Sequence, residues 1–127
     1  MADTQSVLLV DDDKFLLDMY ALKFTQAGFT VHPCFSTHEA LEVLRGGEAP
    51  SAILFDVTMP GEDGFALLQK IHDEKLVPNA RLIALTNQGN DSDKKHAEEL
   101  GVHRYCIKAS MIPSEVVQMV KDELAKT

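Results

Sequence analysis

Acidic, hydroxyl and amine side chains directly follow four separate apolar runs of this 127-residue sequence. These side chains belong to Asp11, Asp12, Asp56, Thr86 and Lys108. Several carboxylates held within a few ångströms of one another cannot all stay ionised without compensation, and a bound cation provides it. If the fold brings the four run ends together, these residues predict a metal site.

Magnesium fits such a set of ligands, because it takes oxygen ligands in an octahedron and usually keeps several waters. We expect Asp12 and Asp56 to be direct ligands and Asp11 to act through a water. The backbone carbonyl of Thr58 could add a third protein oxygen. Mn²⁺ is a second candidate ion, since carboxylates, carbonyls and waters suit it as well.

The same set of residues suits phosphoryl transfer. A carboxylate can accept a phosphoryl group as an acyl phosphate, and Asp56 stands alone at the end of its apolar run. The metal, the Lys108 ammonium and the Thr86 hydroxyl would then neutralise the transferred oxygens. Positioning and charge stabilisation supply nearly all the catalysis in this reaction class.

The elements that carry these residues alternate between short apolar runs and amphipathic stretches. Strands are expected at Val7–Val10, Thr30–Phe35, Ala52–Phe55, Leu82–Leu85 and Tyr105–Ile107. Helices are expected at Lys14–Ala27, at Thr37–Arg45, after the 59–64 loop through Asp73, at 91–100 and from Pro113 onward.

This alternation predicts an α/β fold of five βα units, with a parallel sheet covered on both faces. Pro33 cannot donate to a strand ladder, so its strand should lie at a sheet edge. Right-handed crossovers place the carboxyl ends of all strands at one edge, where open α/β sheets bind their ligands. The polar run ends should therefore meet there.

Composition narrows the class of protein. The formal net charge is −8, which argues against a nucleic-acid-binding face, because such a face needs a basic stripe. No apolar run is long enough to insert into a membrane. Cys34 and Cys106 are predicted to be small apolar residues in a reducing compartment rather than a disulfide, and the five histidines lack metal-site spacing. We expect one cytoplasmic domain over residues 1–127.

Four stretches together resemble the receiver domain of two-component response regulators: VLLVDDD, ILFDVTMPGEDGF, LIALTNQG and YCIKAS, in that order. The resemblance spans essentially the whole chain. It implies a flavodoxin-like doubly wound sheet of strand order 2-1-3-4-5. It also implies Mg²⁺-dependent phosphorylation of Asp56 by a sensor histidine kinase or phosphotransfer protein. Such a domain promotes its own phosphorylation and dephosphorylation without being a turnover enzyme.

The resemblance assigns the other roles residue by residue. Asp11 and Asp12 correspond to the acidic pair, Thr86 to the switch hydroxyl and Lys108 to the phosphate-binding lysine. Tyr105 corresponds to the aromatic residue whose rotamer reports phosphorylation. The implied output surface combines the 91–100 helix, the fifth strand and the last helix, and it would bind a downstream protein or support a phosphorylation-linked dimer.

Two departures from the family pattern bear on the site. Ala109 stands where the family usually has a proline in a cis peptide bond, and such a bond without proline costs roughly 2.5–4 kcal/mol. Asn87 is bulkier than the small residue typical of its position. Together with Thr58 and Gln88, we expect Asn87 to tune the access of water or donor to Asp56.

Three rival functions remain open at this point. A haloacid-dehalogenase-like phosphatase would use the D-x-D within Asp11–Asp13 and carry phosphate on Asp11, although Phe15 does not match its motif. An FMN-binding flavodoxin would need a phosphate-cradling first loop, which aspartates would repel. The third is a receiver that docks partners without phosphorylation. We expect no output domain within residues 1–127, and both a free-standing receiver and a piece of a longer regulator stay open.

Overall fold

The structure of the protein is a computed structural model, which describes residues 5–57, 64–86, 91–108 and 111–126. Strands and helices alternate along these residues. The strands are β1 (Ser6–Val10), β2 (Thr30–Cys34), β3 (Ala52–Asp56), β4 (Arg81–Thr86) and β5 (Arg104–Ile107). The helices are α1 (Lys14–Gln26), α2 (Thr37–Arg45), α3 (Gly64–Asp73), α4 (Asp91–Glu99) and α5 (Pro113–Ala125). Every element predicted from the sequence is present, with boundaries shifted by a residue or two.

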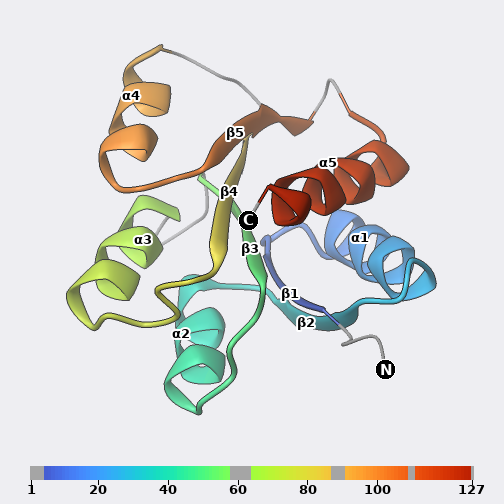
Figure 1. Cartoon of the computed structure of the whole chain (residues 1–127), viewed down its shortest axis with the longest axis horizontal. Coiled ribbons are helices and arrows are strands. Elements are labelled where there is room, and N and C mark those ends of the chain that lie inside the picture. The colour runs from blue at the N-terminus through green and yellow to red at the C-terminus, as the bar shows by residue number, and fades with distance from the viewer. Residues whose placement is uncertain (1–4, 58–63, 87–90, 109–110, 127) are drawn as a thin grey trace.

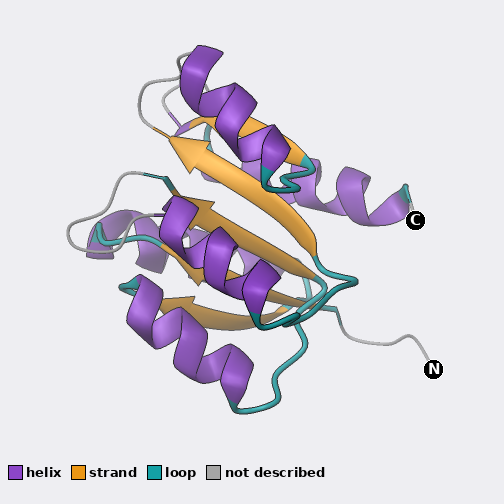
Figure 2. Cartoon of the chain, turned by 90° about the vertical axis from the view of Figure 1, so that its left-hand side faces the viewer, coloured by secondary structure: helices purple, strands orange, loops and turns teal. Residues whose placement is uncertain are grey.

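The strands form one parallel sheet in the order β2-β1-β3-β4-β5. This order confirms the predicted flavodoxin-like sheet. Pro33 lies in β2 at the sheet edge, as its missing N–H group requires. Figure 2 shows the arrowheads of the strands pointing to the same side, so that the carboxyl ends meet at one edge of the molecule.

Helices α2, α3 and α4 cover one face of the sheet, and α1 and α5 cover the other (Figure 1), with an apolar layer beneath each set. Alternate residues of each strand point to opposite faces: Leu8 and Val10 of β1 pack toward α2, α3 and α4, whereas Val7 and Leu9 pack toward α1 and α5. The central strand β3 is buried along its whole length, because both of its faces are covered. The sheet is therefore a rigid frame for the residues at its edge.

Local signals mark the starts and ends of the helices near the positions that the sequence predicts. The Ser36 side chain caps α2 by accepting a hydrogen bond from the N–H of Glu39 at 3.2 Å. Gly28 follows the end of α1 with φ of +96°, a backbone conformation that side chains disfavour. Pro113 is the first residue of α5.

Cys34 and Cys106 are free and buried, as expected for small apolar residues. Among the described residues, no helix combines the length and the apolar character needed to cross a bilayer.

Apolar periodicity predicts that α5 buries Val116, Val117, Val120 and Leu124, and the observed buried face differs from this prediction. Val116, Val117 and Val120 are buried as expected, but Leu124 is half-buried and Glu123 is 4% exposed. Glu123 accepts hydrogen bonds from Arg104 of β5 at 3.3 Å and from Lys126 at 3.1 Å. Burial alone would raise the pKa of Glu123, but these two cations outweigh it and hold the pKa below its ordinary value. Apolar periodicity does not reveal a glutamate buried through its partners.

Replacing Glu123 with Gln should lower the free energy of unfolding at neutral pH by about 1 kcal/mol, because two charge-assisted hydrogen bonds are lost. The lowered pKa means that the carboxylate stabilises the fold above its unfolded pKa and that this contribution disappears as pH falls through the folded pKa. Urea unfolding at pH 7 and pH 3 should therefore show the difference at pH 7 and a smaller one at pH 3. An equal difference at both pH values would contradict the ion-pair account.

Candidate functional site

The register of the strands brings together the polar residues that follow the apolar runs. Val10 of β1 lies opposite Phe55 of β3, so Asp11 and Asp56 follow at the same level. On the other side of β3, Asp56 lies opposite Leu85 of β4, and Thr86 follows. Because β1 and β4 flank β3 and β5 lies next to β4, the carboxyl ends of these strands lie at the edge that carries Asp56.

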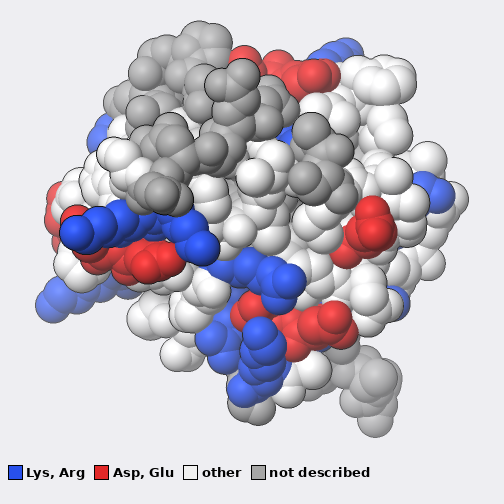
Figure 3. All heavy atoms as spheres, turned by 90° about the horizontal axis from the view of Figure 1, so that it is seen from above, with Lys and Arg blue, Asp and Glu red and all other residues white. Residues whose placement is uncertain are grey.

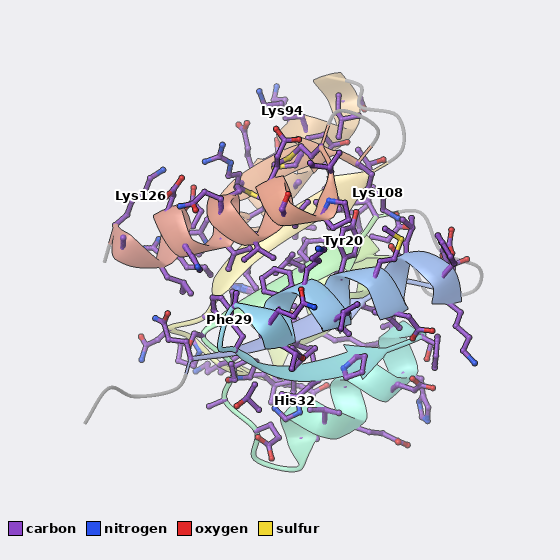
Figure 4. All side chains as sticks on the ribbon, turned by 90° about the vertical axis from the view of Figure 1, so that its right-hand side faces the viewer. Tyr20, Phe29, His32, Lys94, Lys108 and Lys126 are labelled. Atoms are coloured by element: carbon purple, nitrogen blue, oxygen red, sulfur yellow. The ribbon has the colours of Figure 1, made fainter. Side chains whose placement is uncertain are left out.

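Lys108, labelled in Figure 4, donates hydrogen bonds to two buried carboxylates of this edge. Its Nζ donates to Asp11 Oδ2 at 2.6 Å and to Asp56 Oδ2 at 2.8 Å. All three residues are buried: Asp11 and Asp56 are each 3% exposed and Lys108 is 6% exposed. Burial lowers the pKa of Lys108, but the hydrogen bonds that its ammonium donates to the two carboxylates, together with their negative charges, outweigh burial and raise the pKa overall. The lysine therefore stays charged and is held by two partners.

Asp12 completes an acidic group with Asp11 and Asp56, whose carboxylate oxygens lie within 4.8 Å of one another. Asp12 is exposed, whereas the other two are buried. This donor set fits Mg²⁺, because it offers hard oxygen ligands and one carboxylate open to solvent, from which waters can complete an octahedron. One lysine neutralises only one of the three negative charges, so the group keeps a net negative charge that a bound cation would offset.

Asp13, the third carboxylate of the run, has a separate role. It is the N-cap of α1, and its side chain accepts a hydrogen bond from the N–H of Leu16 at 3.2 Å. Its own N–H donates to Asp11 Oδ1 at 2.9 Å. The three consecutive aspartates therefore have two roles. Asp11 and Asp12 belong to the acidic group, and Asp13 caps the start of α1.

Thr86 and Tyr105 lie on β4 and β5, the two strands on one side of β3. Thr86 is the last residue of β4, is 2% exposed and pairs with Ile107 of β5. Tyr105 is half-buried and packs against the apolar layer that contains Ala97 of α4. Thr86 and Tyr105 are therefore near neighbours on the adjacent strands β4 and β5.

Tyr20 of α1 was not predicted to take part in the site. It is 3% exposed and packs in the layer under α1 and α5, where Figure 4 labels it together with Lys108. Burial raises the pKa of Tyr20, and the charges of Lys108, Asp11 and Asp56 also act on it. The helical spacing of Tyr20 predicts only that it is buried, which it is.

Gly64, the first residue of α3, packs directly against the strand that carries Asp56. A Cβ atom at Gly64 would meet the backbone oxygen of Asp56 at 2.5 Å and the Cα of Val57 at 2.9 Å. Both are backbone atoms of the buried end of β3, so they cannot move aside cheaply. Because Gly64 has no Cβ, the first turn of α3 can pack directly on the backbone of Asp56, the candidate phosphoacceptor.

Replacing Gly64 with Ala should lower the free energy of unfolding by roughly 2–4 kcal/mol, since the added methyl overlaps backbone. Gly46→Ala is the matched control, because its Cβ would meet only carbonyl oxygens at 3.3 and 3.4 Å. Urea unfolding of both variants measures the two effects. A Gly64→Ala variant as stable as Gly46→Ala would mean that α3 can shift away from β3 freely.

Four residues singled out in the sequence lie outside the described part of the structure. They are Thr58, Asn87, Gln88 and Ala109. The proposed carbonyl ligand, the two residues expected to tune access and the departure from the family proline therefore stay predictions.

Comparison with known proteins decides the family. The family model described as response regulator receiver domain matches residues 7–121. The chain is a member of that family. The regulatory protein VanRc of Enterococcus gallinarum is 32% identical to this receiver domain over 97% of the chain and 51% of the relative. The transcriptional regulatory protein GltR of Pseudomonas aeruginosa is 32% identical over 94% of the chain and 49% of the relative.

Solved structures of receivers share the fold. A CheY-like receiver domain from Methanospirillum hungatei superposes with a TM-score of 0.88 at 24% identity, covering 98% of this receiver and 96% of the other chain. The chemotaxis protein CheY4 of Vibrio cholerae superposes with a TM-score of 0.87 at 21% identity, covering 94% and 98% of the two chains. At this identity the likeness establishes the fold alone.

The receiver domain spans about half the length of the curated relatives it matches. Its place is in two-component signalling.

Proposed function

We propose that this receiver domain accepts a phosphoryl group on Asp56 from a phosphohistidine donor, with Mg²⁺ bound by Asp11, Asp12 and Asp56. The observation that carries the proposal is the double hydrogen bond of Lys108 to Asp11 and Asp56 inside a group of three carboxylates. A buried carboxylate beside an ammonium and two further acids is equipped both to attack phosphorus and to have the product's charge neutralised.

The transfer needs one bond formed and one broken. An Asp56 carboxylate oxygen attacks the phosphorus of the donor while the P–N bond to the donor imidazole breaks, and the imidazole leaves with the electron pair and takes up a proton. Mg²⁺, when bound, offsets the charge of the phosphoryl oxygens and of the acidic group. The Lys108 ammonium, released from Asp56 Oδ2, would then bind a phosphoryl oxygen as a point charge.

Thr86 and Tyr105 would turn the modification into a change of surface. A phosphoryl group adds a charge near −2 and three acceptor oxygens. The Thr86 hydroxyl, at the end of the adjacent strand, can donate to one of these oxygens. Movement of Thr86 toward Asp56 leaves space on the β4–β5 side that the Tyr105 ring, now half-buried, could fill.

Helix α4 is the element best placed to respond. It buries Ala97 completely, and Leu100 just beyond it is half-buried. His96 stacks on Phe65 of α3 with ring centroids 4.4 Å apart. With so little apolar contact, a few kcal/mol can separate two positions of the helix.

The output surface would comprise α4, β5 and α5. Figure 3 views the molecule from this side, where basic and acidic side chains lie among one another. Lys94, Glu98, Arg104, Glu123 and Lys126 line a hollow of about 310 Å³ there. Such a mixed-charge surface suits a protein partner or a second receiver, whose charges must match in position.

The donor would contact exposed apolar side chains beside the site. Phe15, in the first turn of α1, is 73% exposed, and Ile112, the N-cap of α5, is 61% exposed. Both follow within four residues of a site residue in the sequence, Asp11 and Lys108 respectively. Exposed large apolar residues near a site mouth are typical of a protein-binding surface.

Replacing Phe15 with Ser should slow phosphorylation by a phosphohistidine protein about tenfold or more, because interface aromatic residues carry much of the binding energy. Phosphorylation by acetyl phosphate should be unchanged, since this small donor needs no protein surface. The exposed Leu22, further along α1, provides the control variant Leu22→Ser. Equal slowing with both donors would show that Phe15 acts on the chemistry rather than on docking.

Phosphate localisation tests the proposed function directly. The native chain is incubated with acetyl phosphate and Mg²⁺, and intact-mass spectrometry is expected to show one added phosphoryl group. Borohydride trapping of the acyl phosphate and peptide mapping should then place it on Asp56. Phosphate on Asp11 would instead indicate the phosphatase alternative, and absence of uptake would leave a docking module.

A further inference from the structure

A pocket of about 520 Å³ lies between the carboxyl ends of α3 and α4 and the first residues of β4. Asp56 lies at the other end of the sheet, at the carboxyl end of β3. The two helices are neighbours on the same face of the sheet in Figures 1 and 2. Leu68 and Ile71 of α3, Leu82 of β4 and Leu100 after α4 form its apolar walls. The volume lies within the range of small-molecule sites, on the order of 300–1,000 Å³.

The rim of the pocket carries one lysine and no acidic side chain among the described residues, although the protein is strongly acidic. The lysine is Lys75, and His72 and His103 also line the rim. The chain as a whole carries 20 acidic and 12 basic residues, so an acid-free rim with a lysine is the reverse of the general surface. This charge pattern favours an anionic ligand group.

His103 presents a defined hydrogen-bond donor at this rim. Its Nδ1 accepts a hydrogen bond from the N–H of Leu82 at 3.0 Å. In the neutral imidazole the proton therefore lies on Nε2, which can donate to an anion. Burial lowers the pKa of His103, and the nearby Arg81 lowers it further, which favours this neutral form.

The segment that closes the pocket is strained. Val77 has a φ of +36°, whereas the φ of +55° at Lys75 belongs to the left-handed end of α3, in which the Leu76 N–H donates to the Ile71 carbonyl oxygen at 3.0 Å. A β-branched residue such as Val77 rarely adopts this conformation, and such strain is concentrated at ligand clamps and switch regions. Val77 and Lys75 both line the pocket, so this segment positions a wall and a cation at the same cavity.

We propose that this pocket binds a small amphipathic carboxylate. Its hydrocarbon part contacts Leu68, Ile71 and Leu100, and its carboxylate binds the Lys75 ammonium and the His103 Nε2–H group. Because Leu100 directly follows α4, a ligand that packs on Leu100 also holds the carboxyl end of that helix in place. The ligand would thus act on the helix proposed to move, although its binding does not require phosphorylation.

Octanoate is the probe for the binding test, followed by amide chemical shifts of the full native chain. Shifts should concentrate in residues 68–82 and 100–103. Octanol, which lacks the charge, and acetate, which lacks the hydrocarbon part, should each bind at least about tenfold more weakly. Shifts spread over other surfaces, or equal binding of acetate and octanoate, would overturn the site.

The matched variants are Lys75→Glu and Lys23→Glu, since Lys23 is an exposed lysine on α1. Lys75→Glu should weaken octanoate binding about tenfold or more, and Lys23→Glu should change it less than about twofold. Octanol binding should be similar in both variants, which also verifies that the pocket is intact. Equal weakening of octanoate by both substitutions would show a general charge effect and overturn the role of the rim.

Hydrogen exchange tests the effect on α4. Saturating octanoate should slow exchange of the amides at 96–102 at least about threefold in the native chain, and should leave them unchanged in Lys75→Glu at the same concentration. Binding without slowed exchange would overturn the link to α4. Neither measurement uses phosphate, so the failure of this inference and the failure of the proposed phosphoryl transfer are distinguishable.

Discussion

Replacing Asp56 with Asn is expected to abolish phosphoryl uptake from acetyl phosphate while leaving the fold intact. The amide has nearly the shape of the carboxylate but no anionic oxygen to attack phosphorus. Lys108 keeps its hydrogen bond to Asp11 at 2.6 Å, so no buried cation is left without a partner. The change also removes one of two carboxylates buried side by side, which relieves repulsion between like charges.

The matched control is Asp13→Asn, which makes the same chemical change two residues from Asp11. Asn is as good an N-cap as Asp, so α1 should keep its start, and uptake should remain close to that of the native chain. Intact-mass spectrometry after acetyl phosphate and Mg²⁺ measures both variants. Continued uptake by Asp56→Asn would rule out residue 56 as the acceptor, whereas loss in both variants would indicate a general effect of charge.

The convergence at the carboxyl edge was predictable because it depends only on strand order and direction. Each site residue follows an apolar run, and parallel strands bring run ends together whatever their distance in sequence. The structure accordingly brings Asp11, Asp12 and Asp56 within 4.8 Å. The edge position of β2 was predictable for a similarly local reason, the missing N–H of Pro33.

Features that depend on exact distances were not predictable from the sequence. The close approach of Gly64 to the backbone of Asp56 requires the angle at which α3 meets β3. The burial of Glu123 requires Arg104, 19 residues away on another element. The sequence predicted that Lys108 neutralises transferred oxygens, but not that its ammonium is held between two buried carboxylates. Periodicity reports which face is apolar, but it does not report which polar side chains find partners.

Removing the Lys108 ammonium should produce a large loss of stability in metal-free buffer. In Lys108→Met the apolar stem is retained, but Asp11 and Asp56 remain buried without their shared cation. Leaving buried charges uncompensated costs roughly 3–5 kcal/mol. Urea unfolding at pH 7 in the presence of a chelator measures the loss. Lys121→Met, an exposed lysine on α5, is the control and should change stability by less than about 0.5 kcal/mol.

Adding Mg²⁺ should restore more stability to Lys108→Met than to the native chain. Without the ammonium, the acidic group carries one more unit of uncompensated negative charge and should bind the cation more tightly, and a ligand that binds only the folded state stabilises it. The pKa of Lys108 is raised, so its contribution is fully present below its unfolded pKa and disappears only as pH rises through the folded pKa. The deficit of the variant should therefore stay constant between pH 7 and 9. A Mg²⁺ response equal in the two proteins would mean that the metal binds away from the carboxylates that Lys108 holds.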